Sequence, residues 1–319
     1  MNELLQFVTE NKIQKIAILC DEKVWRLYPD YFNFLNDVTE VHFISIEAKE
    51  KSKDIESIVF GWNFLLEQQF DRNSLLINWG GGTICDIGGM MAATFKRGVR
   101  LVNVPTTLLA MIDAAHGGKN GINLQHQKNV IGTFYLPEKV IVDTTFLKTL
   151  PQKELLNGFA ELIKYALIGN KELWNELQSI TTINHKTIKN EWIEEAIHFK
   201  ETLVVEDLHD KGVRQILNFG HTIGHAIERL FAEKKRVISH GYAVAMGVCY
   251  EAYLSHNQNF ITLQEFEQIL RFILRFYKPL QLADDDLTTL AHYCFEDKKN
   301  INSTLPFIFL EKIGKAISN

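Results

Sequence analysis

Residues 215–228 read QILNFGHTIGHAIE and place His221 and His225 four positions apart. This spacing predicts a helix with both histidines on one face, and Asn218 and Arg214 would lie one and two turns earlier on the same face. The other positions are mostly apolar or small, so the polar stripe is expected to point into packed protein. One interpretation is a pair of core histidines that hydrogen-bond to backbone groups, and the other is a functional site.

Two further segments favour a metal site. A third histidine, His240, follows in SHGYAVAMG, and the helical segment GFAELIKYAL carries Glu161 and Lys164. Two histidines and one glutamate form the ligand set of a catalytic zinc that keeps positions open for substrate.

The composition of the 319 residues is typical of a globular protein, with 46% hydrophobic and 23% charged residues. The net charge of −5 disfavours nucleic acid and acidic membranes as partners. No apolar leader or membrane-length segment is visible in the sequence, and the four cysteines lack CxxC spacing. These features predict a cytoplasmic protein with reduced thiols.

The order of elements predicts two domains. Up to residue 150, short apolar runs alternate with a helical segment at 52–70, which indicates a Rossmann-like α/β domain with a parallel sheet. The expected strands are 15–21, 41–47, 74–82, 99–105 and 139–144. Residues 151–319 have mainly helical periodicity, which predicts an all-α domain with one strand-like pair in TLPFIFLEKIG. The interface of two such domains is a natural place for a site.

Polar motifs of the first half suit an anionic ligand. GGGTICDIGG (80–89) follows a strand and opens a helix, so it is interpreted either as a phosphate-binding turn or as a tight strand–helix connection. Further on, the chain offers two threonines in PTTLLA and the GGK sequence that ends in Lys119. Glycines before a lysine suit an oxyanion held by amides and an ammonium, whereas the alternative is a solvated loop.

In this order the motifs resemble the 3-dehydroquinate synthase family, which belongs to the sugar-phosphate cyclases. The resemblance runs from about residue 21 to residue 314 and is carried by GGGTICD, KRGVRLVNVPTTLLAMID, GGKNGIN, KNVIGTFYLP, FLKTLP, AELIKYALI, LNFGHTIGHAIE and DKK.

The resemblance implies a role for each matched position. Zinc, with Co²⁺ as a possible substitute, would be bound by Glu161, His221 and His240. NAD would contact Asp21, Glu50, Lys53, Gly81, Gly82, Asp86, Thr106, Thr107, Lys128, Phe146 and Thr149. The substrate pocket would comprise Asp113, Lys119, Asn129, Lys164, Lys200, Arg214, Asn218, His225 and Lys298, with Arg97 reaching in from the second subunit of a homodimer.

The implied activity converts 3-deoxy-arabino-heptulosonate 7-phosphate into 3-dehydroquinate and phosphate, as part of the shikimate pathway of aromatic amino acid biosynthesis. Several cations in an acidic protein agree with a substrate that carries both a carboxylate and a phosphate. Two positions depart from the family: Tyr242 replaces a glutamate, and Ala114-Ala115-His116 precedes GGK. The alternatives are another sugar-phosphate cyclase, a metal-dependent polyol dehydrogenase, and an inactive relative that binds NAD and zinc.

Overall fold

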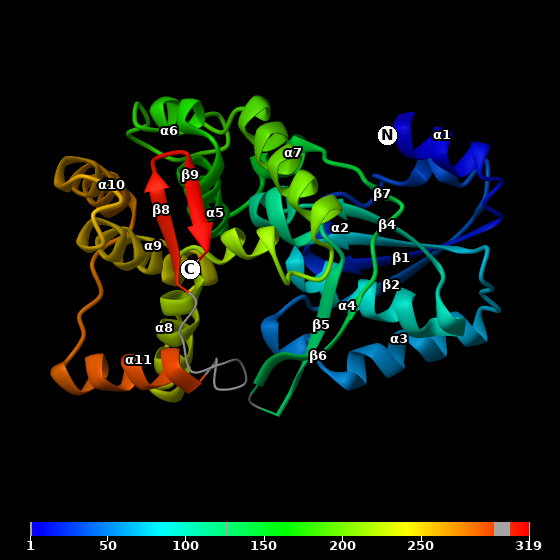
Figure 1. The fold of residues 1–319 in the computed structure, drawn as a ribbon. Helices are drawn as coiled ribbons and strands as arrows, with labels where there is room; N and C mark the ends of the chain where they lie inside the picture. The colour runs from blue at the N-terminus through cyan, green and yellow to red at the C-terminus, as the bar shows by residue number, and fades with distance from the viewer. Residues whose placement is uncertain (1, 126, 297–306, 319) are drawn as a thin grey trace. The chain divides into compact units, whose positions relative to one another are not determined.

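The computed structural model describes residues 2–125, 127–296 and 307–318 (Figure 1). The chain divides into two compact units, Met1–Leu150 and Pro151–Asn319. Among the described helices, none is long and apolar enough to cross a membrane.

The first unit is built on a parallel sheet of five strands in the order β2-β1-β3-β4-β7. β1 and β3 are buried along almost their whole length, as parallel strands covered on both faces must be. The strands are β1 (Lys15–Asp21), β2 (Glu40–Ile46), β3 (Leu75–Gly80), β4 (Arg100–Pro105) and β7 (Lys139–Val140). The strand expected at 139–144 is thus reduced to two residues, paired with β4 alone.

Helices and turns connect these strands. The α-helices are α1 (Asn2–Glu10), α2 (Glu22–Leu27), α3 (Ile55–Glu67) and α4 (Gly82–Thr94). Short 3₁₀ turns cover Asn33–Leu35, Glu50–Ser52, Phe95–Arg97 and Thr144–Lys148, and a π-turn covers Ala110–Ala114. α4 packs closely on β3, because a Cβ on Gly88 would lie 1.6 Å from the amide oxygen of Asn78. The predicted helix 52–70 is α3, which begins after Asp54 caps the amide of Ser57.

A hairpin extends from this unit (Figure 1). β5 (Lys119–Leu124) pairs antiparallel with β6 (Gln127–Phe134), and the amide group of Asn120 ties it to the chain through the carbonyls of Gly118 and Tyr135. Nearly every residue of β6 is exposed.

The second unit is helical, with one small hairpin. Its helices are α5 (Gln152–Gly169), α6 (Lys171–Leu177), α7 (Asn190–Glu206), α8 (His221–Glu233), α9 (His240–Asn257), α10 (Leu263–Phe276) and α11 (Asp284–Glu296), with a 3₁₀ turn at Val213–Asn218. The strand-like pair expected near the end forms β8 (Ile308–Lys312) and β9 (Lys315–Ser318).

The expected helix through residues 215–228 is interrupted. The 3₁₀ turn ends at Asn218, Gly220 adopts φ +78°, and α8 begins only at His221. Arg214 and Asn218 therefore do not share a helical face with the histidines, and that prediction was wrong. A left-handed residue cannot continue a right-handed helix, and glycine adopts that conformation without a Cβ clash.

α8 and α9 cross at unusually short range because their contact residues are glycines. A Cβ on Gly247 would lie 1.9 Å from the carbonyl oxygen of Gly220, and one on Gly220 would lie 2.6 Å from Val248 Cγ2. A Cβ on Gly241 would likewise lie 2.1 Å from the carbonyl oxygen of Asn157 on α5. These contacts bring the first residues of α8 and α9 together beside α5.

Candidate active site

The three residues expected to bind metal converge within the second unit. Glu161 lies in the middle of α5 and is fully buried, while His221 and His240 are the first residues of α8 and α9. One Glu161 carboxylate oxygen, Oε1, lies 3.4 Å from His221 Nε2 and 3.3 Å from His240 Nε2. Two ligand atoms bound tetrahedrally at about 2.1 Å from a zinc ion are about 3.4 Å apart, so these separations match a shared ion.

Both histidines use their other ring nitrogen to fix the ring. His221 Nδ1 lies 3.2 Å from the carbonyl oxygen of Phe219, and His240 Nδ1 lies 3.3 Å from Glu228 Oε2. Acceptors at Nδ1 hold a proton there, so Nε2 is the ring nitrogen that a metal ion would bind, which is the usual arrangement around a metal-binding histidine. Glu228 was missed by sequence reasoning, although its place three residues after His225 was visible.

The start of α9 is fixed by a further residue that the sequence did not single out. The Gly241 amide donates a hydrogen bond to Asn157 Oδ1 at 2.5 Å, which ties the residue after His240 to α5.

The charges of the cluster fit a cation. Glu161 Oε2 pairs with Lys164 Nζ at 2.5 Å, and Glu161 Oε1 faces the Nε2 atoms of both histidines. Burial raises the pKa of the Glu161 carboxyl, but Lys164 and His221 outweigh it and hold that pKa well below its usual range. Burial lowers the pKa of His240, but hydrogen bonds to Glu161 and Glu228 raise it to about 10. A buried anion facing two imidazoles is therefore a suitable donor set for a divalent ion.

The other residues of this unit that were expected in the substrate pocket lie on three neighbouring elements. Lys164, Lys200 and Arg214 are all buried, on α5, α7 and the 3₁₀ turn, and these three elements pack on one another. Arg214 Nη1 donates to the carbonyl of Leu208 at 2.8 Å. Asn218 is half-buried at the end of the 3₁₀ turn.

His225 lies at the exposed edge of the histidine cluster. Its ring centre is 5.4 Å from that of His221 and 6.2 Å from that of His240. An exposed imidazole beside a metal-type cluster can accept a proton and pass it to solvent.

In the first unit, the glycine turn meets the threonines. Gly81 precedes α4 and would place a Cβ 3.0 Å from Thr107 Cγ2, while Gly82 begins the helix. Thr107 Oγ1 accepts the amide of Ala110 at 3.2 Å, and Thr106 is buried. The turn thus approaches its own chain closely while Gly81 and Gly82 remain partly exposed.

Lys53 joins Asp86 and Asn129 into one cluster. Lys53 is 4% exposed, and its Nζ lies 2.6 Å from Asp86 Oδ2 and 2.5 Å from Asn129 Oδ1. Glu50 accepts a hydrogen bond from Asn123 of the hairpin at 3.0 Å. The structure therefore connects Glu50 and Lys53 to the hairpin, a pairing that no sequence spacing indicated.

The remaining residues expected at the cofactor lie at the end of β1 and around the 3₁₀ turn Thr144–Lys148. Asp21 caps α2 by accepting the Lys23 amide at 3.1 Å, and burial raises the pKa of its carboxyl. Phe146 is buried, with its ring centre 5.1 Å from that of Tyr28, and the Tyr28 hydroxyl lies 2.7 Å from Thr149 Oγ1. The Phe146 side chain thus belongs to the core.

The cations and Asp113 lie on loops and on the hairpin. Lys119 begins β5, Lys128 lies on β6, and both are exposed. Asp113 is half-buried in the π-turn. Arg97 is exposed and adopts φ +65°, directly after Lys96 at φ +48°. Lys298 lies outside the described residues.

The two departures from the family pattern have structural roles. The Tyr242 hydroxyl donates to the carbonyl of Lys278, and its ring packs edge-on against Tyr277 at 5.8 Å. His116 is buried, and its Nε2 lies 2.8 Å from the carbonyl oxygen of Met111. The carboxylate beside His240 is supplied by Glu228, so a carboxylate at position 242 is not needed to orient the His240 ring.

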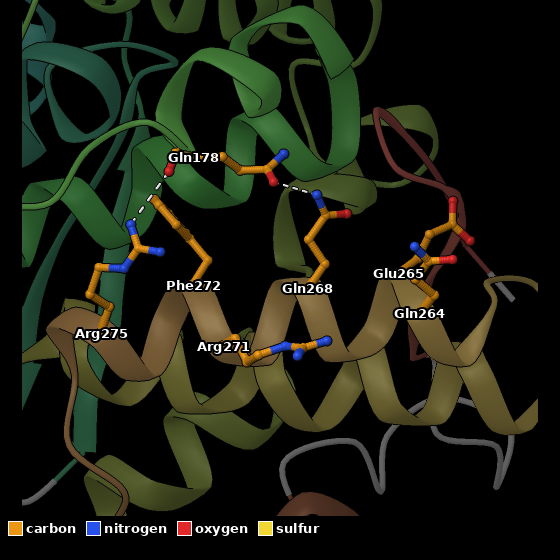
Figure 2. Close-up of a pocket in the computed structure, with 7 residues that line it drawn as sticks. All are labelled: Gln178, Gln264, Glu265, Gln268, Arg271, Phe272 and Arg275. Carbon is orange, nitrogen blue, oxygen red and sulfur yellow. Dashed lines mark hydrogen bonds between the residues drawn. The ribbon is translucent and has the colours of Figure 1, made fainter.

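A surface hollow of about 450 Å³ lies elsewhere in the second unit, between α10 and the end of α6 (Figure 2). Glutamine and arginine side chains line it, and Arg275 Nη1 donates to the carbonyl of Ile180 at 2.7 Å. It contains neither a histidine nor a member of the Glu161 cluster, so we do not assign the chemistry to it.

The fold is shared with two synthases of known structure. The structure of 2-epi-5-epi-valiolone synthase from Streptomyces hygroscopicus, with NAD⁺ and Zn²⁺ bound, matches with a TM-score of 0.88 at 24% identity, covering 97% of this chain and 88% of that one. A structure of 2-deoxy-scyllo-inosose synthase, complexed with carbaglucose-6-phosphate, NAD⁺ and Co²⁺, matches with a TM-score of 0.85 at 24% identity, covering 99% and 88%. These likenesses define the fold class as dehydroquinate synthase-like, as the sequence predicted.

The sequence comparisons go further. Models of the N-terminal and C-terminal parts of 3-dehydroquinate synthase match residues 43–157 and 158–300. The 3-dehydroquinate synthase of Parabacteroides distasonis is 40% identical, over 98% of this chain and 89% of that protein. The chain belongs to the 3-dehydroquinate synthase family, and the resemblance drawn from its motifs is confirmed.

Proposed function

We propose that the protein catalyses the 3-dehydroquinate synthase reaction, in which 3-deoxy-arabino-heptulosonate 7-phosphate gives 3-dehydroquinate and phosphate. The observation that carries the proposal is the convergence of Glu161, His221 and His240, beside the buried Lys164, in a chain of this family. We propose Zn²⁺ as the ion and NAD as the cofactor, since related structures hold NAD⁺ with Zn²⁺ or Co²⁺.

When bound, the metal would lower the pKa of a substrate hydroxyl, and NAD would supply a reversible hydride acceptor. The reaction eliminates phosphate and rebuilds the carbon ring, while the residues named below would hold the substrate in place. The net reaction leaves NAD unchanged.

Residues of the second unit would hold the substrate and move its proton. Lys164 keeps one donor on Glu161 Oε2, which leaves two further N–H donors for an anionic substrate group. His225, exposed beside His221 and His240, would take the hydroxyl proton. Lys200, Arg214, Asn218 and Lys298 would orient the carboxylate and the hydroxyls.

Residues of the first unit would bind NAD and the phosphate. The glycine turn offers partly exposed backbone at Gly81 and Gly82 for a pyrophosphate, with Thr106, Thr107 and Asp86 around it. Asp21, Glu50, Lys53, Lys128 and Thr149 complete the proposed cofactor set, and the buried side chain of Phe146 would support it from the core. Lys119, Asn129 and Asp113 would contact the substrate, and Arg97 of a second subunit in a homodimer would reach its phosphate.

A phosphate-release assay tests the proposal. With the heptulosonate phosphate, Zn²⁺ and NAD⁺ present, we expect phosphate and 3-dehydroquinate in equal amounts, with no net NADH. Omitting NAD⁺ or adding a chelator should abolish release. Net NADH without phosphate would instead establish a dehydrogenase, and bound NAD without any turnover would establish a binding protein.

A further inference from the structure

We propose that His225, Glu228 and His240 form a second divalent-metal site that fills at excess metal and inhibits the enzyme. His225 and Glu228 lie three positions apart on α8 and so share a helical face. One ligand atom from each of the three residues can be chosen such that all lie within 4.8 Å of one another. This group shares only His240 with the Glu161 cluster.

The two groups are separate sites because they use different edges of one imidazole. His240 Nε2 lies 3.3 Å from Glu161 Oε1, whereas His240 Nδ1 lies 3.3 Å from Glu228 Oε2. The two ring nitrogens direct their lone pairs apart, so a single ion cannot bind both. Two imidazoles and a carboxylate suit Zn²⁺, Co²⁺ or Cu²⁺ rather than Mg²⁺ or Ca²⁺.

The second site is expected to be the weaker one. His225 is exposed, and the side chains of His240 and Glu228 are 30% and 11% exposed, whereas Glu161 of the first cluster is fully buried. A second ion must also displace the Nδ1 proton of His240, which leaves to solvent. Filling therefore requires metal beyond the first equivalent.

A metal ion bound at the second site would impair two side chains that we assign to the reaction. It would block the imidazole of His225, which we propose as the proton acceptor, and it would withdraw Glu228 from orienting His240. Losing an outer partner of a metal ligand costs about 10–100-fold in activity, so we expect inhibition of about 10-fold or more at saturation. The inhibitory role rests on the proposed function, but the metal site itself does not.

The test counts metal and activity together on the intact protein. Equilibrium dialysis against buffered Zn²⁺, read by elemental analysis, should show two ions per chain at excess zinc, with phosphate release falling as the second binds. Glu228→Gln should bind one ion and lose the zinc inhibition, judged against its own activity without excess zinc. Glu233→Gln is the matched control, because Glu233 lies on the same helix with a 52% exposed side chain and pairs with Arg229.

Each outcome separates the inference from the proposed function. A wild type that releases phosphate but never binds more than one ion overturns the second site alone. Two ions in Glu228→Gln also overturn it, since the second ion must then lie elsewhere. If Glu228→Gln fails to fold, His225→Ala replaces it, because His225 is exposed. The proposal then expects one bound ion per chain in His225→Ala at excess zinc. No phosphate release at one ion per chain, with a second ion still binding at excess zinc, upholds the site and rejects the proposed function.

Discussion

The substitution Gly247→Ala should separate α8 from α9 and disable the metal cluster. An added Cβ would lie 1.9 Å from the carbonyl oxygen of Gly220 and 3.0 Å from the amide nitrogen of Gly224. Both are backbone atoms, so a rotamer change cannot relieve the contact. To lengthen the contact between the new Cβ and the Gly220 oxygen even to 3.0 Å, the two backbones must move apart by about 1.1 Å. Gly220 directly precedes His221, so this shift displaces the histidine.

The consequence can be given a magnitude. Overpacking of this kind costs about 1–3 kcal/mol of unfolding free energy, which corresponds to a fall in Tm of about 2–12 °C for a unit of this size. Metal ligands tolerate only about 0.2 Å of displacement, so we expect the affinity for zinc to fall about 10–100-fold.

Gly224→Ala is the matched control. Its Cβ would lie 3.3 Å from the carbonyl oxygen of Ala243, a gap that a shift of a few tenths of an ångström relieves. The better helix propensity of alanine, about 1 kcal/mol, offsets that strain. Thermal unfolding with a chelator measures the steric effect, and zinc competition with a chromophoric chelator measures affinity. If Gly247→Ala matched Gly224→Ala in both, the close crossing would not position the ligands.

Three further results are expected. Tyr242→Phe should lose about 0.5–1.5 kcal/mol of unfolding free energy, because the hydrogen bond to the carbonyl of Lys278 disappears, with zinc affinity unchanged; a loss of zinc in dialysis would contradict this. His116→Val should cost about 1–3 kcal/mol in urea unfolding, since the buried Met111 carbonyl loses its donor, and an unchanged midpoint would refute that role. For metal-free protein, the pKa of His240 is raised from 6.5 to about 10, so its contribution to stability is complete below pH 6.5 and is lost as the pH rises through about 10. Urea unfolding in chelator should show this loss in wild type and a weaker one in His240→Ala.

Periodicity predicted the elements whose burial is regular. The run 15–21 became β1 with the expected bounds because both of its faces are covered, and residues 52–70 contain α3. The run 139–144 looked similar, yet only Lys139 and Val140 pair with β4, whereas the other edge strand, β2, pairs over all seven of its residues. An apolar run predicts that a segment is buried, but it does not predict over how many residues the segment pairs with the neighbouring strand.

Backbone conformation and long-range pairing lay beyond the sequence pattern. The histidine spacing was correctly interpreted as helical, but the break at Gly220 depends on α9, whose residues 244 and 248 surround that glycine. Similarly, the contacts of Glu228 with His240 and of Lys53 with Asp86 join residues that no local period connects. The family resemblance supplied the proposed ligand set, whereas the residues that orient these side chains required coordinates.

The placement of the proposed metal ligands on three different helices also bears on how the chain reaches its folded state. Glu161, His221 and His240 come from α5, α8 and α9, so an unfolded chain would bring them together only by closing long loops. An ion bound there would act as a clip that binds the folded state alone. At a free metal concentration of 100 Kd, it would add about 2.7 kcal/mol to the free energy of unfolding. Metal supply would then determine how much folded protein accumulates, in addition to how fast each molecule works.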